Sequence, residues 1–400
     1  MADLLDCVVM PYAWGSRTAI ADLQGRPTPS AQPEAELWMG AHPRGPATLV
    51  RNGQRLSLVD VIARDAEGEL GAVVARAFDR RLPFLMKVLA AGEPLSLQAH
   101  PSLQQARKGF DDEERRGVPL DAPNRNYKDR NHKPELICAL TPFSALCGFR
   151  RVADTMRLFD ALGVRALDRA VAPLRSASPS EGLAHTLRTL MTMREPELGP
   201  VLTSLLDACR AHTGPFAAEC KLALTLSQLY PGDPGIITAL LLNLVSLEPG
   251  EAIYLGAGNL HAYLDGVGVE IMASSDNVLR GGLTPKHVDV DELLRVLQFV
   301  DGPVTPLKPT PMDTHEATWE TPAPEFRLSR VRLDGEPVTR TAAGPEILLC
   351  TEGSVHVDDS RTGALQLDKG QAAFVRAGHT HYSLNGRGVV FRATVGSVPA

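Results

Sequence analysis

The segment PGEAIYLGAGNLHAYLDGVGVE (residues 249–270) has a counterpart in KGQAAFVRAGHTHYSLNGRGVV (residues 369–390), 120 positions later and without a gap. Nine of the twenty positions from 250 to 269 are identical to those from 370 to 389, including His261 and His381. Each copy reads as a short apolar strand, a glycine turn and a second strand that carries a histidine. The repeat therefore predicts two related β-rich units, most simply two jelly-roll barrels.

The chain as a whole divides into three regions with different sequence patterns. Residues 1–150 are broken by Gly and Pro and contain short apolar runs such as LPFLMKVLA (residues 82–90), which are typical of strands. Residues 151–232 carry apolar residues at three- and four-residue spacing, the period of amphipathic helices. Strand texture returns after the helix-like segment ITALLLNLVSLE (residues 237–248). We expect a mainly β protein in which residues 1–150 and 233–312 form the first barrel, 151–232 an inserted α-helical domain, and 313–400 a degenerate second barrel.

The composition excludes several classes of protein. A chain of 400 residues is expected to form two or three domains. The net charge of −6 comes from mixed signs spread along the chain, which argues against a nucleic-acid-binding protein. No run of eighteen apolar residues and no signal peptide is evident, so we expect no membrane association and a cytoplasmic location. The six cysteines include no C-x-x-C pair, which indicates reduced, mostly buried thiols.

Three short motifs carry candidate metal ligands. In LSLQAHP (residues 95–101) the alternation of a strand turns Gln98 and His100 to one side. Glu135, in NYKDRNHKPEL (residues 126–136), stands at the entrance of an apolar strand, and His261 follows the glycine turn of the repeat. Each motif has an alternative interpretation, as a polar strand face, a solvated loop or a structural histidine. Together the four residues offer a two-nitrogen, two-oxygen donor set that suits Zn²⁺, and also Mn²⁺ or Fe²⁺.

A fourth motif, VEIMASSDNVLRGGLTPK (residues 269–286), combines carboxylates and cations around glycine turns. Arg and Lys at the rim of a pocket can hold a phosphate, and glycine lets the backbone approach a ligand. A surface hairpin rich in glycine and charge is the alternative.

These motifs resemble those of type I mannose-6-phosphate isomerases (phosphomannose isomerases) of the cupin superfamily. The matching segments are PYAWGS (11–16), AELWMG (35–40), LPFLMKVL (82–89), PLSLQAHPS (94–102), NYKDRNHKPEL (126–136), GNLHAYL (258–264) and SSDNVLRGGLTPKHVDV (274–290). The resemblance implies two cupin barrels with a helical domain and an aldose–ketose isomerase that acts on a small sugar phosphate, mannose 6-phosphate. It also implies one zinc ion per chain, with Gln98, His100, Glu135 and His261 as ligands. We expect a monomer or a weak homo-oligomer.

Isomerisation through an enediol requires proton transfer between C1 and C2, stabilisation of an oxyanion and a grip on the phosphate. Four residues have the chemistry to carry the proton: His132, Lys133, Glu270 and Asp276. We expect Arg280 to stabilise the enediolate. The substrate- and phosphate-binding candidates are Lys87, Ser96, Tyr263 and Lys286. Lys87 stands in an apolar run, where an unpaired lysine is rare. Trp14 and Trp38 are more consistent with core positions than with the sugar pocket.

The C-terminal copy of the repeat carries His356, His379 and His381 but has no counterpart of Gln98 or Glu135. A structural barrel is therefore favoured there over a second metal site. For the whole chain the alternatives are a non-catalytic sugar-binding cupin and an Fe²⁺ oxygenase. The dense HKPEL segment argues against the first, and Gln98 with cationic partners argues against the second.

Overall fold

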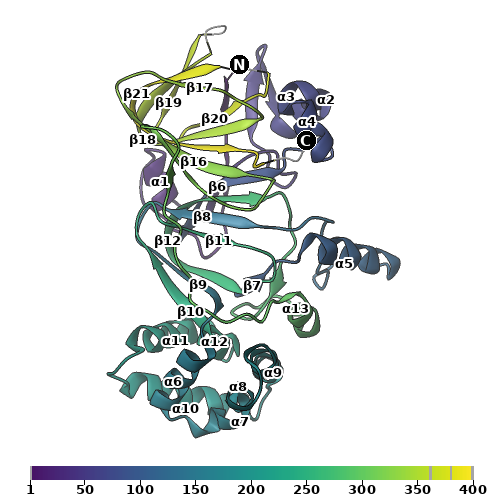
Figure 1. The fold of residues 1–400 in the computed structure, drawn as a ribbon, viewed down its shortest axis with the longest axis vertical. Helices are drawn as coiled ribbons and strands as arrows, with labels where there is room; N and C mark the ends of the chain where they lie inside the picture. Colours follow the sequence, from purple (N-terminus) through teal and green to yellow (C-terminus); the bar gives the residue numbers. More distant parts are fainter. Residues whose placement is uncertain (1, 360–362, 379–380, 398–400) are drawn as a thin grey trace.

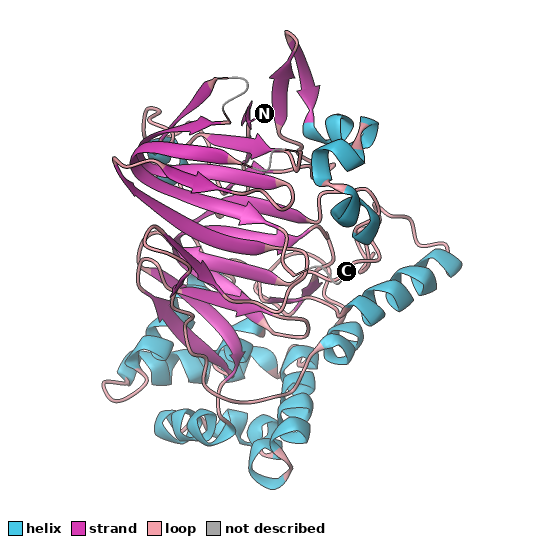
Figure 2. Ribbon diagram, turned by 45° about the horizontal axis from the view of Figure 1, so that its top comes forward, coloured by secondary structure: helices cyan, strands magenta, loops and turns pink. Residues whose placement is uncertain are grey.

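The computed structural model describes residues 2–359, 363–378 and 381–397. The protein is mostly β, with two large antiparallel sheets stacked along its long axis and a block of helices at one end (Figures 1 and 2). Among the described residues, no helix is long and apolar enough to cross a bilayer.

The first sheet has ten strands and carries the metal-site motifs. Its longest strand, β12, pairs with β7 and β9 near its start and with β6 and β8 further along. One strand thus positions His261, Tyr263 and Glu270. The members are β2 (Val8–Met10), β3 (Glu36–Met39), β6 (Phe84–Ala91), β7 (Gln98–Ala99), β8 (Glu135–Ala139), β9 (Phe143–Phe149), β10 (Leu242–Leu247), β11 (Ala252–Leu255), β12 (His261–Ala273) and β13 (Leu279–Arg280).

The second sheet has nine strands and contains the C-terminal copy of the repeat. Its first member, β1, comes from the start of the chain and pairs with β20. The members are β1 (Ala2–Leu5), β14 (Thr310–Pro311), β15 (Glu316–Trp319), β16 (Arg327–Asp334), β17 (Val338–Arg340), β18 (Glu346–Asp358), β19 (Ala364–Asp368), β20 (Ala372–Val375) and β21 (Tyr382–Thr394).

The two copies of the repeat have the same local structure, a short strand followed by a long one: β11 and β12 in the first copy, β20 and β21 in the second. Matched glycines share their backbone geometry. Gly266 has φ 113° and Gly386 has φ 117°, a region that side chains rarely adopt. A Cβ would lie 2.6 Å from a backbone oxygen at either position, Pro142 O or Ser354 O. The prediction of two related β units is confirmed at this level.

The helical block lies between β9 and β10, whose residues Phe149 and Leu242 are paired, so the chain leaves and re-enters at neighbouring strands. Its helices form one hydrophobic core with Leu97, Leu146 and Leu260 of the first sheet. The elements are α6 (Val152–Leu162), the 3₁₀ turn η1 (Arg165–Leu167), α7 (Asp168–Val171), α8 (Pro173–Ser176), α9 (Pro179–Thr192), α10 (Leu198–Ala211), α11 (Ala217–Leu229) and α12 (Gly235–Ala239).

Two expectations about secondary structure need correction. The segment ITALLLNLVSLE is helical only at its start, because α12 ends at Ala239 and residues 242–247 form β10, where pairing with β9 overrides the helical spacing. Residues 1–150 also contain helices beside their strands. The remaining elements are α1 (Ala19–Leu23), the hairpin β4 (Thr48–Arg51) and β5 (Gln54–Ser57), α2 (Leu58–Arg64), α3 (Ala66–Leu70), α4 (Ala72–Ala77), α5 (Leu103–Arg115) and, later in the chain, α13 (Val290–Val296).

A second hydrophobic core joins the two sheets. Leu37 and Val88 of the first sheet pack in one cluster with Ile347, Phe374 and Phe391 of the second. All six cysteines are free, five of them buried, as the sequence predicts. The first sheet is therefore fixed on both sides, by the helical block and by the second sheet.

Candidate metal centre

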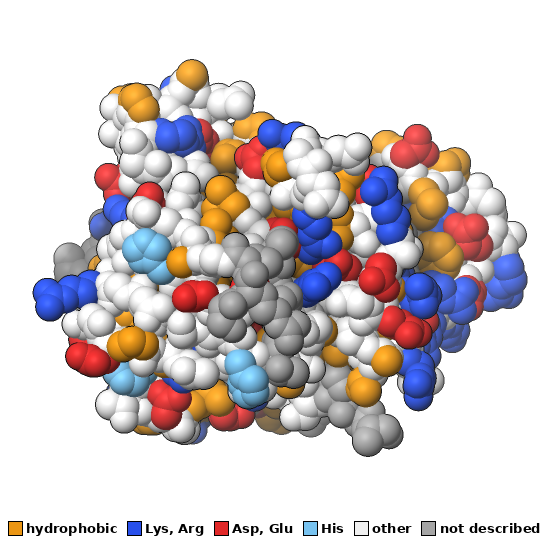
Figure 3. All heavy atoms as spheres, turned by 90° about the horizontal axis from the view of Figure 1, so that it is seen from above, with side chains coloured by type: hydrophobic (Ala, Val, Ile, Leu, Met, Phe, Trp, Pro, Cys, Tyr) orange, Lys and Arg blue, Asp and Glu red, His pale blue; other side chains and the backbone are white. Residues whose placement is uncertain are grey.

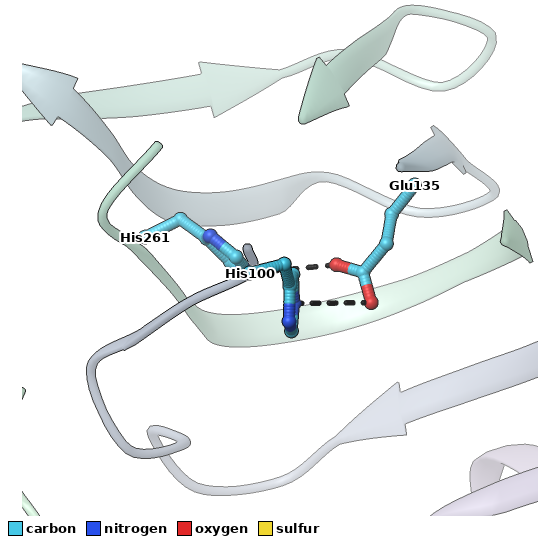
Figure 4. A group of neighbouring side chains, drawn as sticks. All are labelled: His100, Glu135 and His261. Atoms are coloured by element: carbon cyan, nitrogen blue, oxygen red, sulfur yellow. Dashed lines mark ion pairs between the residues drawn. The ribbon is translucent and has the colours of Figure 1, made fainter. Parts of the chain in front are cut away.

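Three buried side chains from strands of the first sheet, or from residues next to them, lie close together. His100 follows β7, Glu135 opens β8 and His261 opens β12, and one ligand atom from each lies within 4.8 Å of the other two. The Nε2 atoms of His100 and His261 each lie 3.4 Å from a carboxylate oxygen of Glu135. Figure 4 shows both imidazoles beside that carboxylate.

The hydrogen bonds of the two histidines leave their Nε2 lone pairs available. His100 Nδ1 lies 2.7 Å from the carbonyl of Asn277, and His261 Nδ1 lies 3.0 Å from the carbonyl of Asn259. Because a carbonyl only accepts, each Nδ1 carries the proton. Both Nε2 atoms and Oε2 of Glu135 are buried without a hydrogen-bond partner, which is costly unless a cation binds them. The donor set and its backbone anchors fit a zinc-type ion.

The protonation states also suit metal binding. Burial lowers the pKa of His100 to about 4, so its imidazole is neutral at pH 7. Burial alone would raise the pKa of Glu135, but Lys133 and His100 outweigh it and hold that pKa well below its usual range. Metal ligands must be deprotonated, and these two are.

Gln98 lies next to this group. Its backbone pairs in register with His261 on one side and with Arg280 on the other. Directly opposite residues on adjacent antiparallel strands carry their side chains on the same face, about 5 Å apart at Cβ. Gln98, His261 and Arg280 therefore form one row across the sheet.

A buried ion-pair cluster lies on the neighbouring strands. The Lys87 ammonium is 2.9 Å from Glu270 and 3.2 Å from Glu36, and the Tyr263 hydroxyl donates to Glu270 at 2.8 Å. Burial raises the pKa of Glu270 although Lys87 opposes the shift. Glu36 was not singled out from the sequence. Glu36 and Trp38 alternate with Leu37 in the segment AELWMG, and this strand-like pattern could have pointed to Glu36.

Arg280 and Lys286 carry uncompensated positive charge. Neither side chain forms a hydrogen bond or ion pair with another described residue. Burial lowers the pKa of both groups, and the charges of Arg280 and Arg44 lower that of Lys286 further. Arg280 and Arg44 are thus near enough to Lys286 to disfavour its charge, an arrangement that favours an anionic ligand.

The proton-transfer candidates separate into two groups. Lys133 Nζ lies 3.2 Å from Glu135, beside the candidate metal ligands. His132 is instead bound to Glu325, at 2.6 Å, in the loop between β15 and β16 of the second sheet. Asp276 faces Arg44, 3.1 Å away, and His42, 3.6 Å away. Neighbours in the sequence such as His132 and Lys133 therefore interact with different partners.

The remaining candidates lie in varied surroundings. Ser96 is partly buried. Its two chain neighbours are held by backbone hydrogen bonds, in which Leu95 N–H donates to the carbonyl of residue 263 and Leu97 N–H to that of residue 282. Trp38 is 4% exposed and donates to Glu36, which fits a core position, whereas Trp14 is partly buried and stacks on Tyr12. In the second sheet His356 and His381 are exposed, and His379 lies outside the described residues.

Comparisons with known proteins agree with this geometry. Residues 3–152 match the family described as phosphomannose isomerase type I, catalytic domain. The mannose-6-phosphate isomerase of Escherichia coli strain K12 is 40% identical over 387 residues, covering 96% of this chain and 97% of the relative. The human mannose-6-phosphate isomerase is 34% identical, with 93% of each chain covered.

Solved structures extend the match to the fold. A lysine-to-alanine mutant of phosphomannose isomerase from Salmonella typhimurium superimposes with a TM-score of 0.92 at 36% identity, covering 99% of this chain and 100% of that one. A zinc-bound mannose 6-phosphate isomerase also gives 0.92, at 38% identity and with the same coverage. The chain therefore belongs to the type I phosphomannose isomerase family, the mannose-6-phosphate isomerases.

Proposed function

We propose that this protein interconverts D-mannose 6-phosphate and D-fructose 6-phosphate at the His100–Glu135–His261 centre. The observation that carries the proposal is the pair of buried, unpaired Nε2 atoms that face one carboxylate beside uncompensated cations. A metal site alone fits many functions. Its combination with a cationic face fits a phosphorylated, oxygen-rich substrate.

We assign one zinc ion to this centre, with Gln98, His100, Glu135 and His261 as its ligands. Bound zinc supplies Lewis acidity that polarises the oxygens on C1 and C2 of the sugar. The proposal is supported by the two-nitrogen donor geometry and by the zinc-bound relative. The carbonyls of Asn259 and Asn277 keep both imidazoles in the tautomer that binds metal.

Within the set His132, Lys133, Glu270 and Asp276, we place proton transfer on Lys133 and Glu270. Lys133 lies against Glu135, and Glu270 is a buried carboxylate with a raised pKa, a property of a base poised nearer neutral pH. His132 and Asp276 are held in ion pairs with Glu325 and Arg44, which favours positioning roles for them.

Arg280 is proposed to stabilise the enediolate, because it stands in the same row as Gln98 and His261 and has no anionic partner among the described residues. Lys286 is proposed to hold the phosphate together with Arg280. Lys87 uses two of its three N–H groups on Glu36 and Glu270, so one remains for substrate. Ser96 and Tyr263 complete the proposed substrate-binding set.

The finer architecture is part of the same proposal. We interpret the two sheets as the walls of two cupin barrels, with residues 151–232 as an inserted helical domain and 313–400 as a structural second barrel. We further propose a cytoplasmic monomer or weak homo-oligomer that binds no nucleic acid, because the net charge is −6.

The proposal is tested by incubating zinc-loaded protein separately with each sugar phosphate and following both by ³¹P NMR. The same equilibrium mixture should form from either side, while unphosphorylated mannose should not react. Binding of mannose 6-phosphate without conversion would favour the alternative of a non-catalytic sugar-binding cupin.

A further inference from the structure

A second cavity, with a volume of about 620 Å³, lies outside the proposed metal centre. It is bounded by α2, the end of α4, the start of α5, residues 128–132 and residues 324–325. Helices α2, α4 and α5 lie on the right-hand side of Figure 1. None of the proposed zinc ligands lines it, nor do Lys87, Lys133 or Arg280.

One wall of this cavity is apolar. It is formed by Val59 and Ile62 of α2, by Phe78 and Leu82 after α4, and by Leu103 at the start of α5. Ile62 and Leu82 are buried, which fixes this wall in place. An apolar wall beside a few polar groups is typical of a site for a flat organic ring. A hexose phosphate has no apolar part that would use it.

Other residues that line this cavity are cationic. Arg81, Arg107 and Lys128 line this cavity and also an adjoining one of about 470 Å³, to which Phe110 and Arg130 contribute. Arg107 forms no hydrogen bond or ion pair with any residue that the structure describes, and Arg81 has only a 3.5 Å contact with Asp79. Figure 3 shows Lys and Arg side chains gathered at the right, the side on which α5 projects in Figure 1.

Four acidic residues line the cavity, and each has a partner; that of Asp79 is Arg81. Asp129 accepts hydrogen bonds from the Ser275 hydroxyl at 2.9 Å and the Asp276 amide at 2.8 Å, and Glu325 pairs with His132. Asp276 itself pairs with Arg44. Positive charge is in excess only where the two cavities adjoin, because Arg81, Arg107 and Lys128 face Asp79 and Asp129 there.

We propose that this cavity is a regulatory site for a nucleoside diphosphate. The base would lie on the Ile62–Phe78–Leu82 wall, and the phosphates would bind Arg81, Arg107 and Lys128 where the two cavities adjoin. Arginine pairs with phosphate through two parallel hydrogen bonds, which gives such a site strength and specificity.

The site is connected to the metal centre through two chain segments. His132 lines the cavity and is followed by Lys133, which contacts Glu135. Asp276 lines it and is followed by Asn277, whose carbonyl holds His100. A ligand that contacts both segments changes the geometry of the metal centre without occupying it, so its effect should fall on kcat more than on KM.

The test is calorimetric titration of the zinc-loaded protein with GDP and ADP, with guanosine and inorganic pyrophosphate as partial ligands. Arg107→Glu is compared with Lys108→Glu, a neighbouring exposed cation on α5 that does not line the cavity. We expect the nucleotide to bind more tightly than either partial ligand. We also expect Kd to rise at least about tenfold in Arg107→Glu, because a charge-assisted phosphate contact is lost, and to stay unchanged in Lys108→Glu.

Circular dichroism of both variants checks their folding, and neither residue belongs to the proposed catalytic set. The inference is overturned if no nucleotide binds at millimolar concentration, or if binding is equal in the two variants. Binding that is purely competitive with the sugar phosphate would also overturn it, by placing the nucleotide at the metal centre. The regulatory effect rests on the proposed isomerase activity, whereas binding does not, so the two failures are distinguishable.

Discussion

Lys87 is a cation enclosed by carboxylates. It is 5% exposed, and its ammonium contacts Glu36 on β3 and Glu270 on β12. Burial alone would lower the pKa of Lys87, but Glu270 and Glu36 outweigh burial and raise it. The group therefore stays charged through the neutral range, and its stabilising contribution is lost only in strong alkali.

Replacing this lysine should be costly for folding. Lys87→Met leaves two buried carboxylates without their cation, which typically costs about 3–5 kcal/mol. The free energy of unfolding in guanidinium chloride measures the loss. Lys286→Met, at an exposed lysine without an ion pair among the described residues, should stay within about 0.5 kcal/mol of the parent protein. Equal losses in the two variants would contradict the buried ion-pair cluster.

The pKa of His100 predicts a pH dependence of the metal-free protein. This pKa is lowered to about 4, whereas an unfolded histidine titrates near 6.5. Between these two pKa values His100 is protonated in the unfolded chain but not in the native protein. The free energy of unfolding therefore falls as the pH falls, by at most about 3 kcal/mol. Glu135, with its depressed pKa, acts in the same direction at lower pH.

Denaturation midpoints measured from pH 7.5 to 4.5 should show this slope, and His100→Asn should flatten it. If the denaturation midpoint of His100→Asn depended on pH as steeply as that of the parent protein, the assignment of this dependence to His100 would be wrong. Zinc affinity of the folded protein should fall only as the pH approaches about 4, where the imidazole of His100 becomes protonated and cannot bind metal.

Three of the four residues predicted as metal ligands from the sequence lie together in the structure, and their role as ligands stays a prediction. His100, Glu135 and His261 each stand in a local pattern of strand alternation or turn, and the family resemblance joined the patterns. The pairing of His132 with Glu325 spans 193 positions, and no local pattern encodes it. Sequence adjacency suggested a joint role for His132 and Lys133, but their side chains interact with different partners.

Strand β12 and its counterpart β21 depend on glycines that have no room for a side chain. Gly266→Ala and Gly386→Ala place a Cβ 2.6 Å from a backbone oxygen at a φ near 115°. Each should destabilise the protein by roughly 1–3 kcal/mol or more, since backbone strain adds to the clash. Gly302→Ala is the control, because its Cβ would meet nothing within 4 Å.

Thermal unfolding of the three variants measures these effects. A variant of Gly266 or Gly386 as stable as Gly302→Ala would contradict the matched geometry of the two repeats.

Elements with a strong local signal were predictable, and elements fixed by distant contacts were not. The apolar run at residues 82–90 became β6, and the repeat gave both long strands. Residues 242–247 are leucine-rich and read as a helix, but pairing with β9 makes them a strand. Helices α2, α3 and α4 have five to seven residues each, too short for periodicity to show.

At the scale of the whole molecule, the helical block shares its core with the first sheet. Replacing residues 152–241 by a short turn is sterically allowed, because Phe149 and Leu242 are paired. It would nonetheless expose Leu97, Leu146 and Leu260, which are at most 1% exposed in the intact protein. Size-exclusion chromatography should show aggregation and zinc binding should weaken; a monomeric, zinc-loaded product would show that the block is energetically independent.

The sequence indicated two β units and a helical block but not how they interlock. Pairing of β1 with β20 joins the start of the chain to a strand beginning at residue 372, and the shared core around Leu37 and Phe374 follows from that packing. Contacts at such separation depend on the assembled fold rather than on local pattern.

The proposed function requires one zinc ion at His100, Glu135 and His261 for isomerisation of mannose 6-phosphate. To measure this directly, the protein is stripped of metal with a chelator, and fructose 6-phosphate formation is followed while zinc is added stepwise. We expect no turnover in the stripped protein and full recovery at about one zinc per chain, with no recovery in His261→Ala. Turnover that survives complete removal of metal, or that zinc restores equally in His261→Ala, would contradict this requirement.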